Sequence, residues 1–162
     1  MEQIENEPGE TMESIESILE RAQIRARNLG LPYRGALSPA EALTIWQSIE
    51  GAQVVDVRTR AELDWVGRVP GAVHIEWNHY PGGIRNARFA EELKLSVERS
   101  GAPVMFLCRS GNRSHFAAAV AAQLGYSAAF NILEGFEGDR DPQGHRNTVN
   151  GWRVAGLPWT QG

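Results

Sequence analysis

The chain has 162 residues, enough for one compact domain with its own core and too few for two of ordinary size. Its net charge of −4 argues against the basic surface that nucleic-acid-binding domains carry. No apolar run is long enough to cross a bilayer, and the first residues are acidic where a secretory signal would be basic and then apolar. We therefore expect a cytoplasmic protein whose function involves neither nucleic acid nor a membrane.

The N-terminal segment has two parts that differ in composition. Residues 1–12 contain proline, glycine and several glutamates, and we expect them to be flexible. From Ser14 onward, apolar side chains recur at steps of three and four residues, which predicts an amphipathic accessory helix within residues 13–30, ending at Gly30. The simpler interpretation is that this helix packs on the domain. The alternative is self-association of two copies of the chain through it.

The rest of the chain alternates between strand and helix patterns. Capping boxes at Ser38 and Thr59 each predict the start of a helix. The sequence predicts strands over residues 52–57, 72–75, 103–108 and 127–133, and helices over 38–49, from 59 onward, over 87–98 and over 115–125. This alternation predicts an α/β fold, with a central, mostly parallel sheet and helices on both of its faces. Ligands of such sheets bind at the carboxyl ends of the strands, which is where Cys108 is expected.

Cys108 is the only cysteine of the chain, which excludes an internal disulfide and a cysteine-rich zinc site. The four histidines have no metal-binding spacing, so no metal is expected. A loop of small residues that leads into a helix directs backbone N–H groups inward, and together with the helix dipole they stabilise a thiolate. Gly111 allows a backbone conformation that other residues avoid, while Arg109 and Arg113 supply permanent charges suited to an anionic substrate. We therefore predict that Cys108 is a nucleophile.

Three segments, in this order, resemble the signatures of the rhodanese sulfurtransferases. VVDVRTRAEL (54–63) resembles the N-terminal signature of the family, and GRVPGAVHI (67–75) resembles its second signature, with Arg68 where histidine is usual. CRSGNR (108–113) is similar to the six-residue active-site loop C-x-x-G-x-R. The GHR and GLPW segments near the end of the sequence resemble those of single-domain bacterial members. The resemblance implies a rhodanese-like domain over residues 36–160.

The resemblance also implies a reaction that needs neither a metal nor an organic cofactor. Cys108 would take the sulfane sulfur of a small-molecule donor such as thiosulfate, carry it as a persulfide and pass it to a thiol or to cyanide. Asp56, Arg58 and Glu62 would be structural support, and the position of Glu62 one turn into the following helix allows Arg58 to pair with it. Arg109 and Arg113 would hold the anionic oxygens of the donor; the alternative is that one of them braces the loop by bonding backbone carbonyls. The residues implied to bind the substrate are Arg109, Ser110, Gly111, Asn112, Arg113 and Ser114.

Three other functions stay open at this stage. Cysteine phosphatases of related fold resemble C-x5-R, whereas here the sixth residue after the cysteine is Ser114 and the arginine is the fifth. This shorter loop favours a single sulfur atom over a phosphate. Arsenate reductases with several cysteines are disfavoured, because the chain has no second thiol to resolve an intermediate. The third alternative is a sulfur carrier or binding module without turnover, since the presence of Cys108 excludes only the commonest inactive form.

Overall fold

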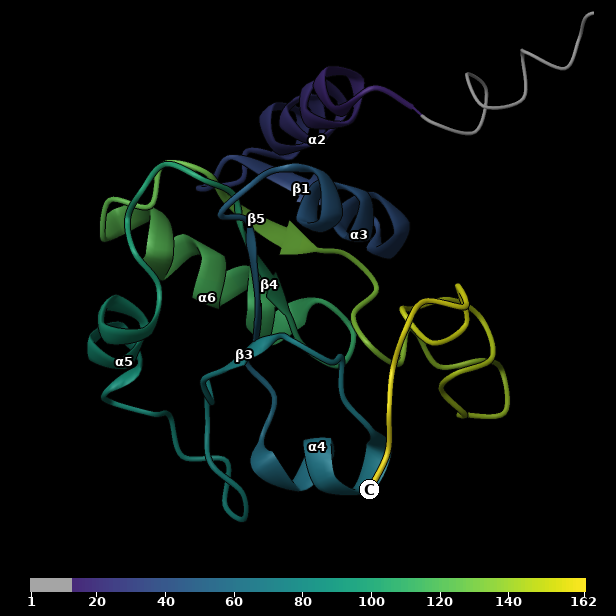
Figure 1. Ribbon diagram of the computed structural model, residues 1–162. Helices are drawn as coiled ribbons and strands as arrows, with labels where there is room; N and C mark the ends of the chain where they lie inside the picture. The colour runs from purple at the N-terminus through teal and green to yellow at the C-terminus, as the bar shows by residue number, and fades with distance from the viewer. Residues whose placement is uncertain (1–12) are drawn as a thin grey trace, which may run out of the picture.

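A parallel sheet with the strand order β1-β5-β4-β2-β3 forms the centre of the computed structural model, which describes residues 13–162 (Figure 1). Residues 1–12, expected to be flexible, lie outside the described part. The strands are β1 (Gly35–Leu37), β2 (Gln53–Asp56), β3 (Val73–His74), β4 (Val104–Leu107) and β5 (Ala129–Ile132). The helices are α2 (Ile15–Leu29), α3 (Pro39–Ser48), α4 (Arg60–Val66), α5 (Phe89–Ser96) and α6 (Asn112–Gln123). The predicted α/β architecture is confirmed, and these five strands are all parallel.

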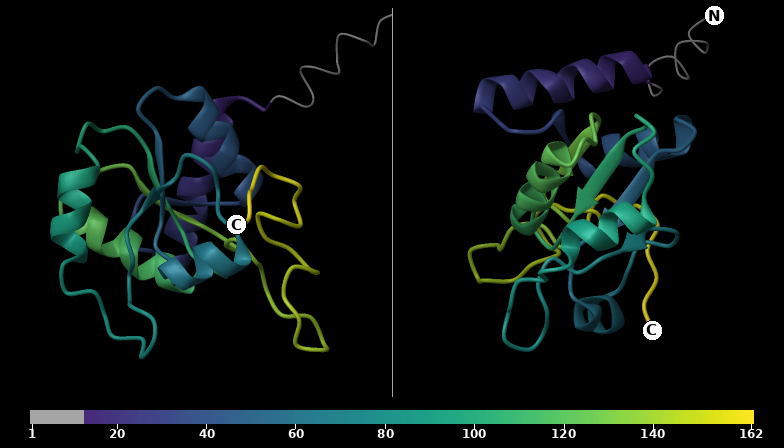
Figure 2. Two further views of the ribbon diagram at one scale, coloured as in Figure 1. Left: turned by 60° about the horizontal axis from the view of Figure 1, so that its bottom comes forward. Right: turned by 90° about the vertical axis from the view of Figure 1, so that its left-hand side faces the viewer.

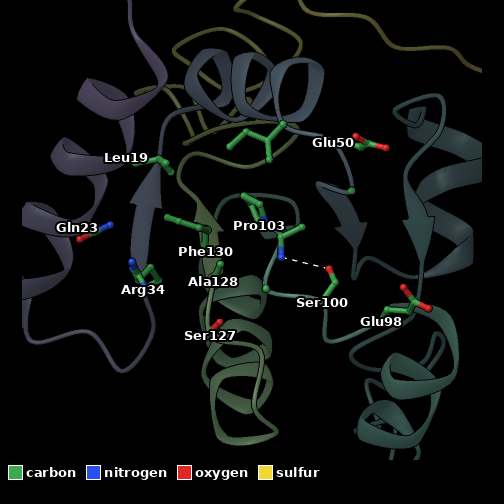
Figure 3. Close-up of a pocket in the computed structure, with 14 residues that line it drawn as sticks. Leu19, Gln23, Arg34, Glu50, Glu98, Ser100, Pro103, Ser127, Ala128 and Phe130 are labelled. Carbon is green, nitrogen blue, oxygen red and sulfur yellow. Dashed lines mark hydrogen bonds between the residues drawn. The ribbon is translucent and has the colours of Figure 1, made fainter.

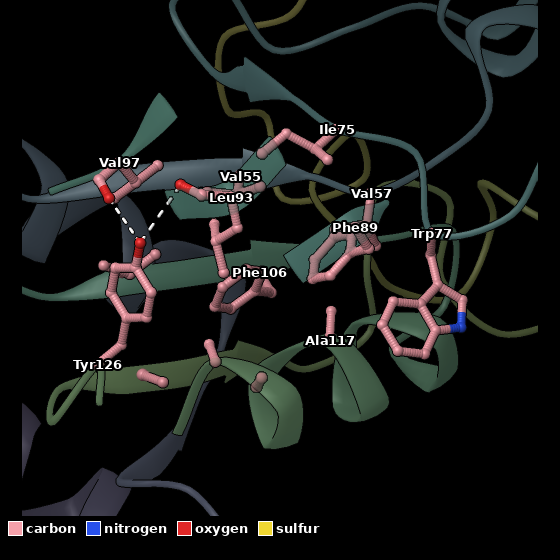
Figure 4. Packing of buried hydrophobic residues seen from close by; sticks show 14 of the residues in the cluster. Val55, Val57, Ile75, Trp77, Phe89, Leu93, Val97, Phe106, Ala117 and Tyr126 are labelled. Atoms are coloured by element: carbon pink, nitrogen blue, oxygen red, sulfur yellow. Dashed lines mark hydrogen bonds between the residues drawn. The ribbon is translucent and has the colours of Figure 1, made fainter. Parts of the chain in front are cut away.

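Both faces of the sheet are covered by apolar layers. Successive side chains of a strand point to opposite faces. Val55 therefore joins the layer under α5 and α6 (Figure 4), while Val54 joins the layer under α3. Three alanines of α6 are fully buried, and their small size lets this helix lie close to β4 and β5. This close packing fixes the position of the first turn of α6, which is part of the candidate active site. In the described part of the chain, no helix is long and apolar enough to cross a membrane.

The expected amphipathic helix is α2, at the margin of the domain (Figure 2). The side chain of Ser14 caps its first turn, and Gly30 ends it in the left-handed conformation, as the sequence predicts. A Cβ atom on Gly35 would lie 2.9 Å from the backbone of Ala22, so the glycine allows close approach of α2 and β1. The buried residues of α2 are Ile18, Ala22 and Ala26. The middle of its apolar stripe is thus covered by the domain itself, while Leu29 at the end of the helix is 69% exposed.

Two ion pairs also connect α2 to the domain. Glu41 of α3 accepts hydrogen bonds from Arg21 and from Arg25, whose guanidinium also donates to the carbonyl oxygen of Ala36 at 2.8 Å. Burial alone would raise the pKa of Glu41, but the bonds from Arg25, Ser38 and Arg21 outweigh burial and lower it to about 2. These contacts attach one face of α2, and self-association through its other faces stays a prediction.

Strand β1 is not predicted by the sequence pattern. This strand has three residues, too few for an alternating pattern to be recognised. Its identity as a strand depends on parallel pairing with β5, where Gly35 lies opposite Phe130. Such pairing joins segments that are far apart along the chain, so the residues near β1 do not indicate it.

Candidate active site

Cys108 lies at the carboxyl end of β4, as the sequence predicts. Residues 108–111 form the turn that leads from β4 into α6. Gly111 is the N-cap of α6 and has a φ of 104°, a value that residues with a side chain rarely adopt. The glycine therefore lets the chain reverse directly above the cysteine and begin the helix there.

The sulfur of Cys108 accepts hydrogen bonds from the start of α6. Its Sγ lies 3.2 Å from the backbone nitrogen of Gly111 and 3.3 Å from that of Ser114. The residue is buried, with 1% of its surface exposed. Two N–H donors and the positive end of a twelve-residue helix therefore face the sulfur, which is the arrangement that stabilises a thiolate.

Ser114 and Asn131 extend this network behind the sulfur. The Ser114 hydroxyl lies 3.2 Å from Cys108 Sγ and 2.6 Å from Asn131 Oδ1, and Asn131 Nδ2 donates to the carbonyl oxygen of Gly111. Ser114 was expected to bind substrate, but it is fully buried and contacts Cys108 Sγ from inside the domain. Asn131 was not predicted to be part of the site, although an amide within the apolar run of the last predicted strand is a signal of a buried hydrogen-bonding role.

The segment after β5 holds the outer side of the loop. Phe136 N–H donates to the carbonyl oxygen of Cys108 at 2.8 Å, and Glu137 N–H donates to that of Arg109 at 2.9 Å. A Cβ atom on Gly135 would lie 2.4 Å from the carbonyl carbon of Arg109, which is closer than real Cβ contacts come. Only a residue without a side chain fits there, so Gly135 makes this bracing possible.

Arg113 is the arginine that braces the loop. Its two terminal nitrogens donate to the Glu62 carboxylate of α4 at 2.8 and 2.9 Å, so the bracing runs through a carboxylate and not through backbone carbonyls. Glu62 also accepts a hydrogen bond from the backbone of Thr59, which completes the predicted capping box. Burial alone would raise the pKa of Glu62, but the bonds from Arg113 and Thr59 lower it to about 2 from an ordinary 4.5.

The expected pair between Arg58 and Glu62 is wrong. The fully buried guanidinium of Arg58 binds Asp56 at 2.8 Å and lies 4.2 Å from the centre of the Phe136 ring. The Asp56 carboxylate also accepts the backbone N–H of Arg58, and this short turn directs the arginine inward, away from α4. Arg58 donates as well to the carbonyl oxygen of Gly67. Through these bonds, Asp56 and Arg58 connect the end of β2 to the backbone at Gly67.

The remaining loop residues face outward. Arg109 and Asn112 are exposed, and Ser110 is half-buried. No residue from 13 to 162 forms an ion pair or a side-chain hydrogen bond with the Arg109 guanidinium. Of the two loop arginines, Arg109 is therefore the one whose charge faces solvent without a carboxylate partner in the described part of the chain. Residues 13–162 hold no cluster of His, Cys, Asp and Glu side chains that could bind a metal ion.

A cavity of about 520 Å³ adjoins the loop. It lies between α4 and residues 78–83, the segment that follows β3, and Arg109 and Arg113 contribute to its wall. Trp65 and Tyr80 also line it, and Trp65 was missed because an exposed aromatic residue in a short helix has no sequence signature. A second cavity, of about 680 Å³, is lined by α2 and by residues that precede β1, β2, β4 and β5, and therefore lies at the opposite end of the sheet from Cys108 (Figure 3).

Comparison with known proteins adds three relatives. The Rhodanese-like domain family matches residues 40–140. The thiosulfate sulfurtransferase GlpE of Pseudomonas entomophila is 34% identical over 101 residues, which are 62% of this chain and 80% of that protein. An uncharacterized protein of Rickettsia rickettsii, the RP600 homolog, is 35% identical over 113 residues, 69% of this chain and 85% of its own. The crystal structure of Rv0390 from M. tuberculosis has a TM-score of 0.74 and 43% identity, and the match covers 80% of this chain and 99% of that one.

Proposed function

This chain belongs to the rhodanese-like domain family, and from this premise we propose that it is a sulfurtransferase that carries sulfur as a persulfide on Cys108. One observation carries the proposal: the N–H groups of Gly111 and Ser114, at the start of α6, point at Cys108 Sγ. The similarity to thiosulfate sulfurtransferase GlpE supports thiosulfate as the donor.

The first half of the reaction loads the cysteine. The Cys108 thiolate attacks the outer sulfur of thiosulfate, and a new S–S bond forms. The original S–S bond of thiosulfate breaks, its electron pair leaves with sulfite, and Cys108 becomes a persulfide. Arg109 binds the anionic oxygens of the donor, since its guanidinium faces solvent. Arg113 stays paired with Glu62 and keeps the loop in shape.

The second half discharges the persulfide. A nucleophile, either cyanide or a thiolate, attacks the outer sulfur, and the bond between the two sulfurs breaks. The electron pair returns to Cys108, whose thiolate is again stabilised by the helix N–H groups. The donor and the acceptor use the same sulfur in turn, so the kinetics follow a ping-pong scheme. No step of this reaction requires a metal or an organic cofactor.

The mass of the intact protein tests the proposal directly. Incubation with thiosulfate should add the mass of one sulfur atom, and a short incubation with cyanide should remove it and produce thiocyanate. The Cys108→Ser variant should fold normally and gain no mass, because a serine hydroxyl cannot form a persulfide. A wild-type protein that stays unmodified, or a Cys108→Ser protein that still makes thiocyanate at a comparable rate, would refute the assignment.

A further inference from the structure

We infer that the cavity between α4 and residues 78–83 binds the sulfur acceptor, and that it selects organic thiols that carry a carboxylate. This inference rests on the proposed persulfide at Cys108, and it concerns which acceptor discharges that persulfide. Three properties of the cavity support it: its size, its charge and its position.

The cavity is much larger than the small ions used in sulfur-transfer chemistry. Its volume is about 520 Å³, within the range of roughly 300 to 1,000 Å³ typical of pockets for organic ligands. Thiosulfate and cyanide would leave most of it filled with water. Two aromatic rings form part of its wall: Trp65 is 70% exposed, Tyr80 is 62% exposed, and their ring centres lie 6.4 Å apart. An organic molecule would cover these rings and release the water around them.

The charge of the cavity favours an anion. The Glu62 carboxylate in its wall is paired with Arg113. His79 contacts the Glu76 carboxylate, and Glu76 is not part of the cavity wall. Within residues 13–162, no carboxylate pairs with Arg109, so this guanidinium supplies the open positive charge of the wall. A guanidinium presents two parallel N–H donors that match the two oxygens of a carboxylate.

The position of the cavity connects this binding site to the nucleophile. Arg109 directly follows Cys108 in the sequence, and Arg113 lies in the first turn of α6, whose N-terminus faces the sulfur. Both arginines are therefore part of the segment 108–113 around the sulfur and also of the wall of the cavity. The inference therefore places the carboxylate of the thiol on Arg109 and its carbon chain along Trp65, with its sulfur towards the loop that contains Cys108.

The chemical step balances without any further reactant. The acceptor thiol loses its proton to solvent and attacks as a thiolate. A bond forms between its sulfur and the outer sulfur of the persulfide, the bond to Cys108 Sγ breaks, and the electron pair returns to Cys108 as a thiolate. The product is the persulfide of the carboxylate-bearing thiol.

The first experiment compares acceptors with the thiosulfate-loaded wild-type protein. Mercaptopropionate carries a carboxylate, mercaptoethanol is neutral and of similar size, and cyanide lacks an organic part. We expect kcat/KM for mercaptopropionate to exceed that for mercaptoethanol by about tenfold, as for one charge-assisted hydrogen-bonded pair. In Arg109→Gln this ratio should fall towards one, whatever the variant does to loading. Equal use of the two thiols by the wild-type protein would overturn the inference.

The second experiment tests the aromatic wall. Trp65→Ala should lower kcat/KM for mercaptopropionate by about tenfold relative to that for cyanide. Leu95→Ala is the matched control, because Leu95 is 78% exposed on α5 and lies outside the cavity wall. This variant should behave like the wild type with both acceptors. An unchanged ratio in Trp65→Ala would overturn the inference.

The two proposals fail in different ways. A protein that never gains sulfur from thiosulfate contradicts the proposed function. A protein that loads normally and discharges to cyanide, but shows neither the carboxylate preference nor the effect of Trp65, contradicts only the acceptor site. If Trp65→Ala slows loading from thiosulfate and leaves discharge to mercaptopropionate unaffected, the cavity serves the donor and the acceptor assignment is wrong.

Discussion

Arg113 at the start of α6 donates from both terminal nitrogens to the Glu62 carboxylate of α4, at 2.8 and 2.9 Å. The two residues are 51 positions apart in the chain. Their bidentate geometry is the stronger and more directional form of an arginine–carboxylate pair. The pair joins the cysteine loop to the helix that lines the adjoining cavity, so changes at Glu62 should affect both stability and catalysis.

The first prediction concerns stability in acid. The pKa of Glu62 is lowered to about 2 in the folded protein, below the ordinary 4.5. Stability from this carboxylate is therefore fully present above about pH 4.5 and is lost as the pH falls towards 2. In Glu62→Gln the free energy of unfolding near pH 7 should fall by on the order of 2 kcal/mol and depend less on pH in this window. Urea unfolding at a series of pH values measures both effects.

Glu41 provides the control for that experiment. Its pKa is also lowered to about 2, but it pairs with Arg21 and Arg25 of α2, away from the cysteine loop. Glu41→Gln should flatten the same acid window and leave sulfur transfer unchanged, whereas Glu62→Gln should also slow transfer. Equal transfer rates in the two variants would show that the pair of Glu62 and Arg113 does not support the loop.

The second prediction concerns the glycine that packs against the loop. Gly135→Ala should displace the backbone of Arg109, because the new Cβ would lie 2.4 Å from its carbonyl carbon. Thermal stability and the rate of persulfide loading should both fall. Gly144→Ala is the control, since Gly144 also has a positive φ but has open space around it. Its cost should be limited to backbone strain, about 1 to 2 kcal/mol, and its loading rate should match the wild type. Equal loading by the two variants would contradict the bracing role.

The third prediction concerns the hydroxyl behind the sulfur. Ser114 can share its proton with Cys108 Sγ or with Asn131 Oδ1, at 3.2 and 2.6 Å. Removing the amide in Asn131→Ala leaves the hydroxyl free to donate to the sulfur, which should favour the thiolate. Removing the hydroxyl in Ser114→Ala takes one donor from the sulfur and should disfavour the thiolate. The rate of alkylation by iodoacetamide at slightly acidic pH should therefore rise several-fold in the first variant and fall several-fold in the second.

Opposite changes in the alkylation rates of Asn131→Ala and Ser114→Ala distinguish this mechanism from a general loss of core packing. Each variant removes polar atoms from a buried site, so each should also lose some stability. Loss of packing alone would change alkylation in the same direction in both proteins. Changes of the same sign would therefore contradict the role of Asn131 as a competitor for the Ser114 proton.

The fourth prediction concerns loop length. Insertion of one alanine between Asn112 and Arg113 produces the spacing of the related phosphatases and widens the ring of N–H donors. Sulfur transfer should fall at least tenfold, and binding of phosphate or arsenate, measured by calorimetry, should become detectable. The insertion also moves Arg113 away from Glu62. The rate of sulfur transfer in Glu62→Gln therefore measures how much of the decrease comes from losing this ion pair alone. Unchanged sulfur transfer would show that loop length does not select the substrate.

Much of the fold follows from short-range signals in the sequence. Both predicted capping boxes, at Ser38 and Thr59, form with both of their reciprocal hydrogen bonds. The helix that was predicted to end at Gly30 does so, and the cysteine occupies the end of a strand. These features depend on residues within one or two helical turns of each other. Their physical causes, which are backbone hydrogen bonding, glycine conformation and apolar periodicity, are therefore present in the local sequence.

The sequence by itself determined the place of Cys108 at the end of a strand, the glycine-containing loop that follows it and the alternation of strands and helices, because each depends on neighbouring residues. Only the tertiary structure decided which groups surround that loop. Glu62 pairs with Arg113 and not with Arg58, and Asn131 reaches Ser114 across the gap between β5 and α6. Gly135 fits against Arg109 because the chain returns there after β5. These contacts join residues from separate elements, and their partners are selected by how the sheet and helices pack, which local propensity does not encode.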